Sequence, residues 1–277
     1  MATRAEKDLS TAKPDHAAHV GANRDYFDAE VHRYDARPEV RRVARHVGEL
    51  ILREYPDFDE ESTVLMDFAC GSGLISQALA PYCKKIVGVD ISPGTVEYYN
   101  TRVKNQGISP EEMKAVCVDL GGEEGELEGI KFDIVVCCQS YHHMASIETT
   151  TRMLASFLRP GGTLVVVDLI RNEDALRFHE ESVAAINEEA DTADKEHPHG
   201  QENQAHDHTA AHGHHHSRTR PHFHDHIVPH KGGFVEEEIR TAFEGAGLRD
   251  YEWKAALKIR TSSGKRSPEL FVAKARR

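Results

Sequence analysis

The segment from Asp67 to Gly73 (DFACGSG) constrains the fold of this chain more than any other. It follows a short apolar run at residues 63–67, and the helical pattern of residues 74–80 begins directly after it. Glycine adopts backbone conformations that are closed to other residues, and it lets a ligand approach the main chain closely. The first N–H groups of the following helix can point at that ligand. The segment therefore predicts a buried strand, a ligand-binding turn and a helix, in that order.

The alternation of strand and helix continues along the chain. Apolar runs at residues 85–90, 114–119, 132–138 and 162–168 predict four more strands, and helical patterns cover residues 93–105 and 147–157. Ser92 and Pro93 are typical of a helix start, as cap and first position. Strands that are apolar on both faces and alternate with helices imply a parallel sheet that is covered on each side.

The C-terminal part predicts an antiparallel addition to this sheet. An amphipathic helical pattern at residues 235–246 is followed by strands near residues 251–260 and 269–275, around a turn at residues 261–266. A hairpin after the last helix places an antiparallel strand beside parallel ones. The predicted fold class is thus α/β, with a Rossmann-like, seven-stranded, mostly parallel sheet and a C-terminal antiparallel hairpin strand.

Two polar regions lie outside this predicted core. Residues 1–22 are polar and aperiodic, which predicts a disordered N-terminus before one domain at residues 23–277. The domain begins with a helical entry that ends at Pro56. Residues 172–230 form an acidic and His-rich insertion after the fifth strand, and its residues 195–221 are predicted to be disordered.

Carboxylates at the ends of predicted strands indicate a nucleoside site. Asp90 ends the second strand, where a carboxylate can accept both hydroxyls of a ribose. Asp119 ends the third strand, where a carboxylate can accept the exocyclic amine of adenine. The dinucleotide fingerprint G-x-G-x-x-G would require glycine where Ser76 stands, which disfavours NAD or FAD.

Taken together, the motifs resemble those of a known family. Residues 67–73, 89–92, 117–120 and 158–164 resemble the ordered motifs of class I S-adenosylmethionine (SAM)-dependent methyltransferases. The flanking segments at residues 26–28, 34–35 and 229–234 resemble the UbiE-like, methyltransferase type 11 group. The resemblance covers about residues 24–170 and 220–275. It implies methyl transfer from SAM to a small-molecule acceptor, with release of S-adenosylhomocysteine.

The resemblance also implies where SAM lies. Gly71 and Gly73 would lie under its methionine part, and Asp90 would hold the ribose. The adenine would pack on Ile91, and Gln139 would lie near the methionine end. The full set of cofactor-binding residues that the resemblance implies is Asp67, Ala69, Gly71, Gly73, Asp90, Ile91, Asp119, Leu120 and Gln139. Ala69 departs from the fullest motif, which has glycine at this position.

Two candidate catalytic residues, His142 and His143, follow the fourth predicted strand. Either imidazole could take a proton from the acceptor as a general base. Alternatively, both histidines orient the loop and the site works by positioning, which we favour because the sulfonium of SAM is an activated donor. The candidate substrate-binding residues are Tyr26, Phe27 and Tyr34, with a role in the core as the alternative.

The insertion carries a His-rich tract, since residues 195–230 hold twelve of the nineteen histidines. Neutral imidazoles at short spacing can bind Zn, Ni or Cu. The candidate weak metal site is formed by His212, His214, His215 and His216. No CxxC or HExxH pattern fixes a geometry, which favours adventitious over physiological binding. The alternative functions are metal handling through this tract and a non-catalytic SAM-fold protein that binds a partner.

Charge and composition limit the partners of the chain. The net charge is −12, and residues 172–216 carry −9 of it. An acidic chain without a basic stripe disfavours nucleic acid as a partner, and the chain has no apolar stretch long enough for a membrane span. The N-terminus lacks the apolar core of a secretory signal, and all five cysteines fall in predicted core elements. These features predict a cytoplasmic protein in a reducing compartment.

Overall fold

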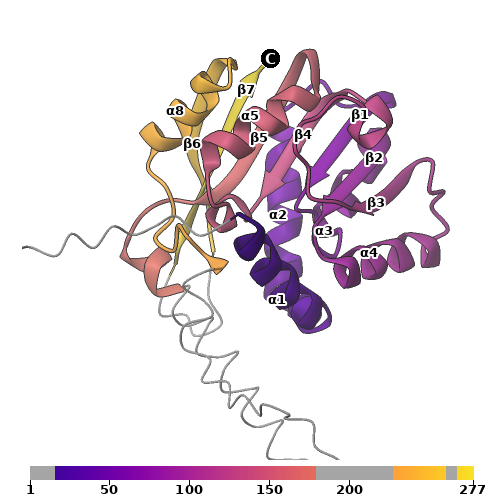
Figure 1. Cartoon of the computed structure of the whole chain (residues 1–277), viewed down its shortest axis with the longest axis horizontal. Helices are drawn as coiled ribbons and strands as arrows, with labels where there is room; N and C mark the ends of the chain where they lie inside the picture. The colour runs from indigo at the N-terminus through magenta and orange to yellow at the C-terminus, as the bar shows by residue number, and fades with distance from the viewer. Residues whose placement is uncertain (1–15, 179–226, 260–266) are drawn as a thin grey trace, which may run out of the picture.

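The computed structural model describes residues 16–178, 227–259 and 267–277, and a seven-stranded sheet lies at its centre (Figure 1). The strands are β1 (Asp59–Phe68), β2 (Cys83–Asp90), β3 (Met113–Cys117), β4 (Phe132–Cys138), β5 (Leu158–Leu169), β6 (Arg249–Lys258) and β7 (Glu269–Arg276). Their order is β3-β2-β1-β4-β5-β7-β6. The first five strands pair in parallel, and β7 is antiparallel to both β5 and β6. The predicted Rossmann-like fold with its antiparallel strand is confirmed.

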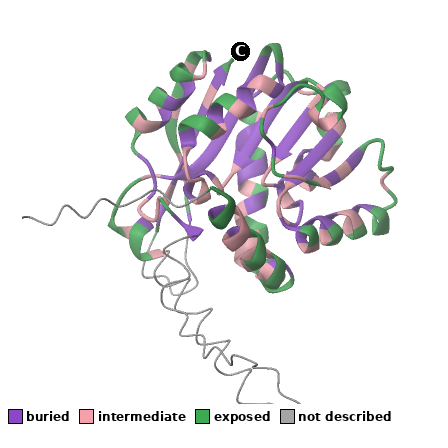
Figure 2. Cartoon of the chain, viewed as in Figure 1, coloured by how far each residue is buried: buried purple, intermediate pink, exposed green. Residues whose placement is uncertain are grey.

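Helices cover both faces of this sheet. They are α1 (His16–Ala36), α2 (Pro38–Glu54), α3 (Leu74–Leu79), α4 (Pro93–Asn105), α5 (Ile147–Phe157) and α8 (Glu236–Gly245), with short 3-10 helices η1 (Ala80–Tyr82), η2 (Glu126–Gly129) and η3 (Tyr141–His143). Leu65 faces the core under α2, α3 and α4, whereas its neighbour Met66 faces the core under α5 and α8. The strands therefore form the buried layer between two helical layers (Figure 2).

The N-terminus differs from the prediction, because α1 begins at His16. The prediction of disorder up to residue 22 is thus wrong for residues 16–22, while residues 1–15 lie outside the described part. Polar contacts hold this helix in place. His19 is 4% exposed, and its Nε2 lies 2.6 Å from the carbonyl oxygen of His143. The amide of the buried Asn23 donates to the carbonyl of His19 at 3.1 Å. Polar contacts of this kind do not produce the repeat of apolar residues by which a helix is predicted from sequence.

The insertion begins where β5 leaves the sheet, and its residues 173–178 are helical. Residues 179–226, which include the predicted disordered segment and the candidate metal ligands, lie outside the described residues. The chain is described again from the buried Ile227, and a bridge between Ile170 and Phe234 holds it against the end of β5. Among the residues that the structure describes, no group of three or more His, Cys, Asp or Glu side chains could hold a metal ion. None of the described helices combines the length and apolar character that a bilayer crossing requires.

Candidate functional site

The predicted site residues lie around one edge of the sheet, where the carboxyl ends of the parallel strands meet. The glycine turn follows β1, Asp90 ends β2, and Gln139 follows β4. Helix α1 lies along this edge. Its His16 Nε2 is 3.2 Å from a carboxylate oxygen of Asp119, and Asp28 accepts a hydrogen bond from the backbone N–H of Gly94 at 2.9 Å. One polar helix thus touches the segments that follow β2 and β3.

The two glycines of the turn serve different purposes. Gly71 has a φ of +52° and Gly73 a φ of +82°, both in the left-handed region that glycine tolerates. A Cβ at Gly71 would meet nothing within 4 Å, so the main chain faces open space there. A Cβ at Gly73 would lie 2.5 Å from Cδ2 of Tyr99. Gly71 therefore leaves room for a ligand, whereas Gly73 allows the turn to pack on α4.

The carboxylate of Asp90 is fixed beside this open space. Its Oδ2 accepts from the N–H of Gly71 at 2.9 Å, and its Oδ1 accepts from the N–H of Ser92 at 3.0 Å. Burial is the largest cause that raises the pKa of Asp90 above its ordinary value. Each carboxylate oxygen has a second lone pair, so both can accept a further hydroxyl. This geometry fits the ribose of a nucleoside.

The other acidic residues of the predicted set differ in depth. Asp67 is 2% exposed and accepts from the hydroxyl of Ser76 at 2.6 Å, and burial raises its pKa to about 7. It lies beneath the turn rather than at the surface. The side chain of Asp119 is 48% exposed, beyond the end of β3. Leu120 is buried in the core under α5 and α8, and Ile91 is half-buried.

Two residues of the predicted set adopt backbone conformations that favour glycine. Ala69 has a φ of +55° and Gln139 a φ of +53°. They follow the neighbouring strands β1 and β4, and the N–H of Gln139 donates to the carbonyl of Val167 at 2.7 Å. Such conformations cost about 1–3 kcal/mol each and cluster at functional sites. Their position supports the assignment of this edge as the site.

The structure separates the roles of the two histidines in η3. His142 is 6% exposed, and its Nδ1 lies 2.7 Å from Oδ1 of Asp168. His143 lies against α1 and against the segment that begins at Ile227. Its Nδ1 is 3.1 Å from Oδ1 of Asn23 and 3.2 Å from the carbonyl oxygen of Ile227. His142 is thus paired with a carboxylate, whereas His143 connects three segments of the fold.

Asp168 is the main functional candidate that the sequence reasoning missed. It is fully buried near the end of β5 and also accepts from the N–H of Leu169 at 2.7 Å. Burial favours its neutral form, but the charge and the hydrogen bond of His142 outweigh burial and hold the pKa of Asp168 below its ordinary value. The available signal was its position, since Asp168 ends a predicted strand in the same way as Asp67, Asp90 and Asp119.

The candidate substrate-binding aromatics are divided. The ring of Phe27 meets that of His143 edge-on, with centroids 5.2 Å apart, and Tyr26 contacts Phe27 at 5.1 Å. These two residues therefore lie beside η3. Tyr34 lies two helical turns further along α1 and is 44% exposed.

Comparisons with known proteins agree with this architecture. The family model of a methyltransferase domain matches residues 66–164. An uncharacterized methyltransferase of Schizosaccharomyces pombe is 40% identical over 127 residues, which cover 44% of this chain and 45% of that protein. A ubiquinone biosynthesis O-methyltransferase of Rhizobium etli is 31% identical over 115 residues, 42% of this chain and 44% of that protein. The matches thus span less than half the length of these curated relatives.

Solved structures share the fold over nearly the whole chain. Magnesium protoporphyrin IX methyltransferase of Synechocystis, with bound S-adenosylhomocysteine, has a TM-score of 0.58 at 14% identity and covers 94% of this chain and 99% of its own. The N-methyltransferase NodS of Bradyrhizobium japonicum, in complex with the same product, has a TM-score of 0.54 at 15% identity, with coverage of 92% and 98%. Residues 66–164 thus match a methyltransferase domain, and the chain shares its fold with these solved methyltransferases.

Proposed function

We propose that this chain transfers a methyl group from SAM to a hydroxyl-bearing small molecule and releases S-adenosylhomocysteine. The observation that carries the proposal is the carboxylate of Asp90, which two backbone N–H groups hold beside the open face of Gly71. A carboxylate beside a glycine turn at the carboxyl end of a strand is an arrangement that can bind the ribose of a nucleoside.

In this proposal each residue of the edge contacts a different part of SAM. Asp90 accepts the ribose hydroxyls, Ile91 packs on the adenine, and the exposed carboxylate of Asp119 accepts the adenine amine. Gly71, Ala69 and Gln139 lie near the methionine end. Asp67, Gly73 and Leu120 are buried beneath them and shape the site without facing its opening.

The pairing of His142 with Asp168 favours a hydroxyl as the acceptor. An ionised Asp168 holds the imidazole proton on Nδ1, which leaves the lone pair on Nε2. When bound, SAM supplies the methyl group, because its S–CH₃ bond breaks as the O–CH₃ bond of the product forms. The acceptor proton passes to Nε2 of His142, and the buried carboxylate stabilises the resulting imidazolium. An alcohol has a high pKa, so a base contributes more there than for an amine or a thiolate.

Two further observations support the proposal, and a third concerns the compartment. The Rhizobium etli relative carries the name of an O-methyltransferase. Phe27 and Tyr26 lie beside η3, where they would form an apolar wall for the acceptor. All five cysteines are free in the structure, which supports a reducing compartment such as the cytoplasm.

Asp90→Ala tests the proposal directly. The substitution removes two charge-assisted hydrogen bonds to the ribose and should weaken SAM binding by about 3–6 kcal/mol, because each such bond contributes about 1.5–3 kcal/mol. Isothermal titration calorimetry measures the affinity. Asp57→Ala is the matched control, since the side chain of Asp57 is 64% exposed and pairs with Arg276. Unchanged SAM affinity in Asp90→Ala would remove the central assignment. Transfer of labelled methyl from SAM to amines but not to hydroxyl compounds would overturn the acceptor class.

A further inference from the structure

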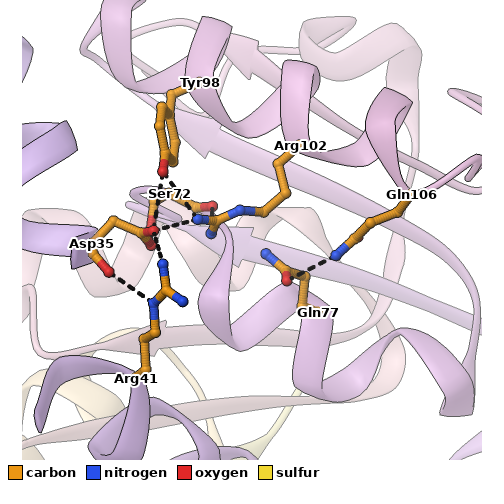
Figure 3. A network of polar contacts seen from close by, with 7 residues as sticks. All are labelled: Asp35, Arg41, Ser72, Gln77, Tyr98, Arg102 and Gln106. Carbon is orange, nitrogen blue, oxygen red and sulfur yellow. Dashed lines mark hydrogen bonds and ion pairs between the residues drawn. The ribbon is translucent and has the colours of Figure 1, made fainter. Parts of the chain in front are cut away.

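Asp35 is a buried carboxylate that joins three elements around the glycine turn (Figure 3). It lies in the last turn of α1 and has no exposed surface. The hydroxyl of Ser72 donates to its Oδ1 at 2.7 Å. Its Oδ2 accepts from the hydroxyl of Tyr98 at 3.1 Å, from Nη2 of Arg41 at 3.2 Å and from Nη2 of Arg102. One side chain thus connects the turn to α2 and to α4.

Ser72 is held by this cluster through both of its available oxygens. Besides the hydroxyl bound to Asp35, its carbonyl oxygen accepts from Nη1 of Arg102 at 2.9 Å. Ser72 lies between Gly71 and Gly73, so the cluster fixes the middle of the turn. The N–H of Gly71, one residue earlier, donates to Asp90. The turn is therefore anchored on one side by Asp35 and on the other by Asp90.

The charge of the cluster supports a role that depends on an ionised carboxylate. Burial by itself favours the neutral acid, but the hydrogen bonds from Arg102 and Ser72 outweigh it and hold the pKa of Asp35 below its ordinary value. Two guanidinium groups face this single carboxylate. An amide at this position keeps only one oxygen: an N–H turned toward the arginines would meet donors only, and an N–H turned toward Ser72 would reverse the direction of that hydrogen bond.

We infer that Asp35 is a positioning residue for SAM binding. It sets the conformation of Ser72 and thereby holds the open face of Gly71 toward the ribose-binding carboxylate of Asp90. This inference rests on the proposed function, because it requires SAM as the ligand of the turn. Asp35 lies beneath the turn and acts through Ser72.

The test is SAM affinity by calorimetry in Asp35→Asn and Ser72→Ala, together with steady-state kinetics. Asp35→Asn should bind SAM at least tenfold more weakly, with a matching rise in KM for SAM and with kcat at saturating SAM within threefold of the wild type. Ser72→Ala should weaken SAM in the same direction. The double variant should be no weaker than Asp35→Asn alone, because both changes break one connection.

Two control variants separate this role from general stability. Gln106 is the residue directly after α4, and its amide donates to Oε1 of Gln77 in α3 at 3.2 Å (Figure 3). Gln106→Ala removes this contact and leaves the contacts of Ser72 in place. Asp25→Asn removes an exposed charge from α1. Both should keep the wild-type SAM affinity, whatever their melting temperatures. If Asp35→Asn does not fold, Ser72→Ala decides the question.

The outcomes distinguish this inference from the function on which it rests. A wild-type chain that does not bind SAM overturns both. A wild type that binds SAM, beside folded Asp35→Asn and Ser72→Ala variants with affinities within twofold, overturns the positioning role alone. Loss of affinity in Asp35→Asn that is matched in Gln106→Ala shows a structural effect and also overturns it.

Discussion

At the scale of single residues, the two glycines of the turn after β1 should respond differently to a methyl group. Gly73→Ala places a Cβ 2.5 Å from Cδ2 of Tyr99, at a residue with a φ of +82°. We expect this variant to lower the free energy of unfolding by about 2–4 kcal/mol, because the site is overpacked and its backbone is left-handed. The Cβ of Gly71→Ala has no atom within 4 Å, so this variant should lower the free energy of unfolding by only about 1–2 kcal/mol. It should weaken SAM binding more than it destabilises the fold. Urea unfolding without SAM measures the stability of each variant, and calorimetry measures its affinity for SAM. Equal destabilisation by both variants would contradict the assignment of Gly73 to packing and Gly71 to the ligand.

At the scale of elements, η3 connects the ends of β4 and β5 through His142 and reaches α1 through His143. His142→Ala should lower kcat about 100-fold, the usual scale of general-base catalysis, with SAM affinity preserved. Asp168→Asn keeps the shape of the pair and should lower kcat without adding to the effect of His142→Ala. His143→Ala should lower kcat by much less, because its contacts with Asn23 and Ile227 place it in a connecting role. Normal turnover in His142→Ala would return both histidines to positioning.

At the scale of the whole molecule, the buried Asp67 should make stability depend on pH. Its folded pKa is about 7 and its unfolded value is the ordinary 3.8, so its contribution to stability is complete below pH 3.8. As the pH rises from about 4 to 7, the unfolded state loses this proton before the folded state does, and stability falls by up to about 1.4 kcal/mol per pH unit. Asp67→Asn has no carboxyl group to titrate at this position. The free energy of unfolding of the variant should therefore rise relative to that of the wild type as the pH increases from 5 to 8. Asp35 and Asp168 have lowered folded pKa values and act only below this window. Urea unfolding at both pH values measures the difference, and a constant difference between the two proteins would contradict the prediction.

The sequence by itself determined the elements whose patterns are local. The predicted bounds of β4 and α5 match the structure, and Ser92 caps α4 through its hydroxyl, which accepts from the N–H of Thr95 at 3.1 Å. Strand periodicity, helix capping and a glycine turn each depend on residues that are neighbours in the chain, so a single sequence contains them. The carboxyl ends of parallel strands then had to meet at one edge, which brought Asp90 and the glycine turn together.

Only the tertiary structure decided which distant polar residues meet. His142 and Asp168 are 26 positions apart, Asp35 and Ser72 are 37 apart, and His19 reaches a carbonyl 124 positions away. None of these pairs has a periodic pattern, because a hydrogen bond between two elements requires one residue on each rather than a repeat along either. For the same reason α1 was predicted to start late, since buried polar groups rather than an apolar stripe hold its first turns. The proposed cofactor site follows from strand order, whereas the contact of His142 with Asp168, the contact of Asp35 with Ser72 and the position of α1 follow from how the layers pack.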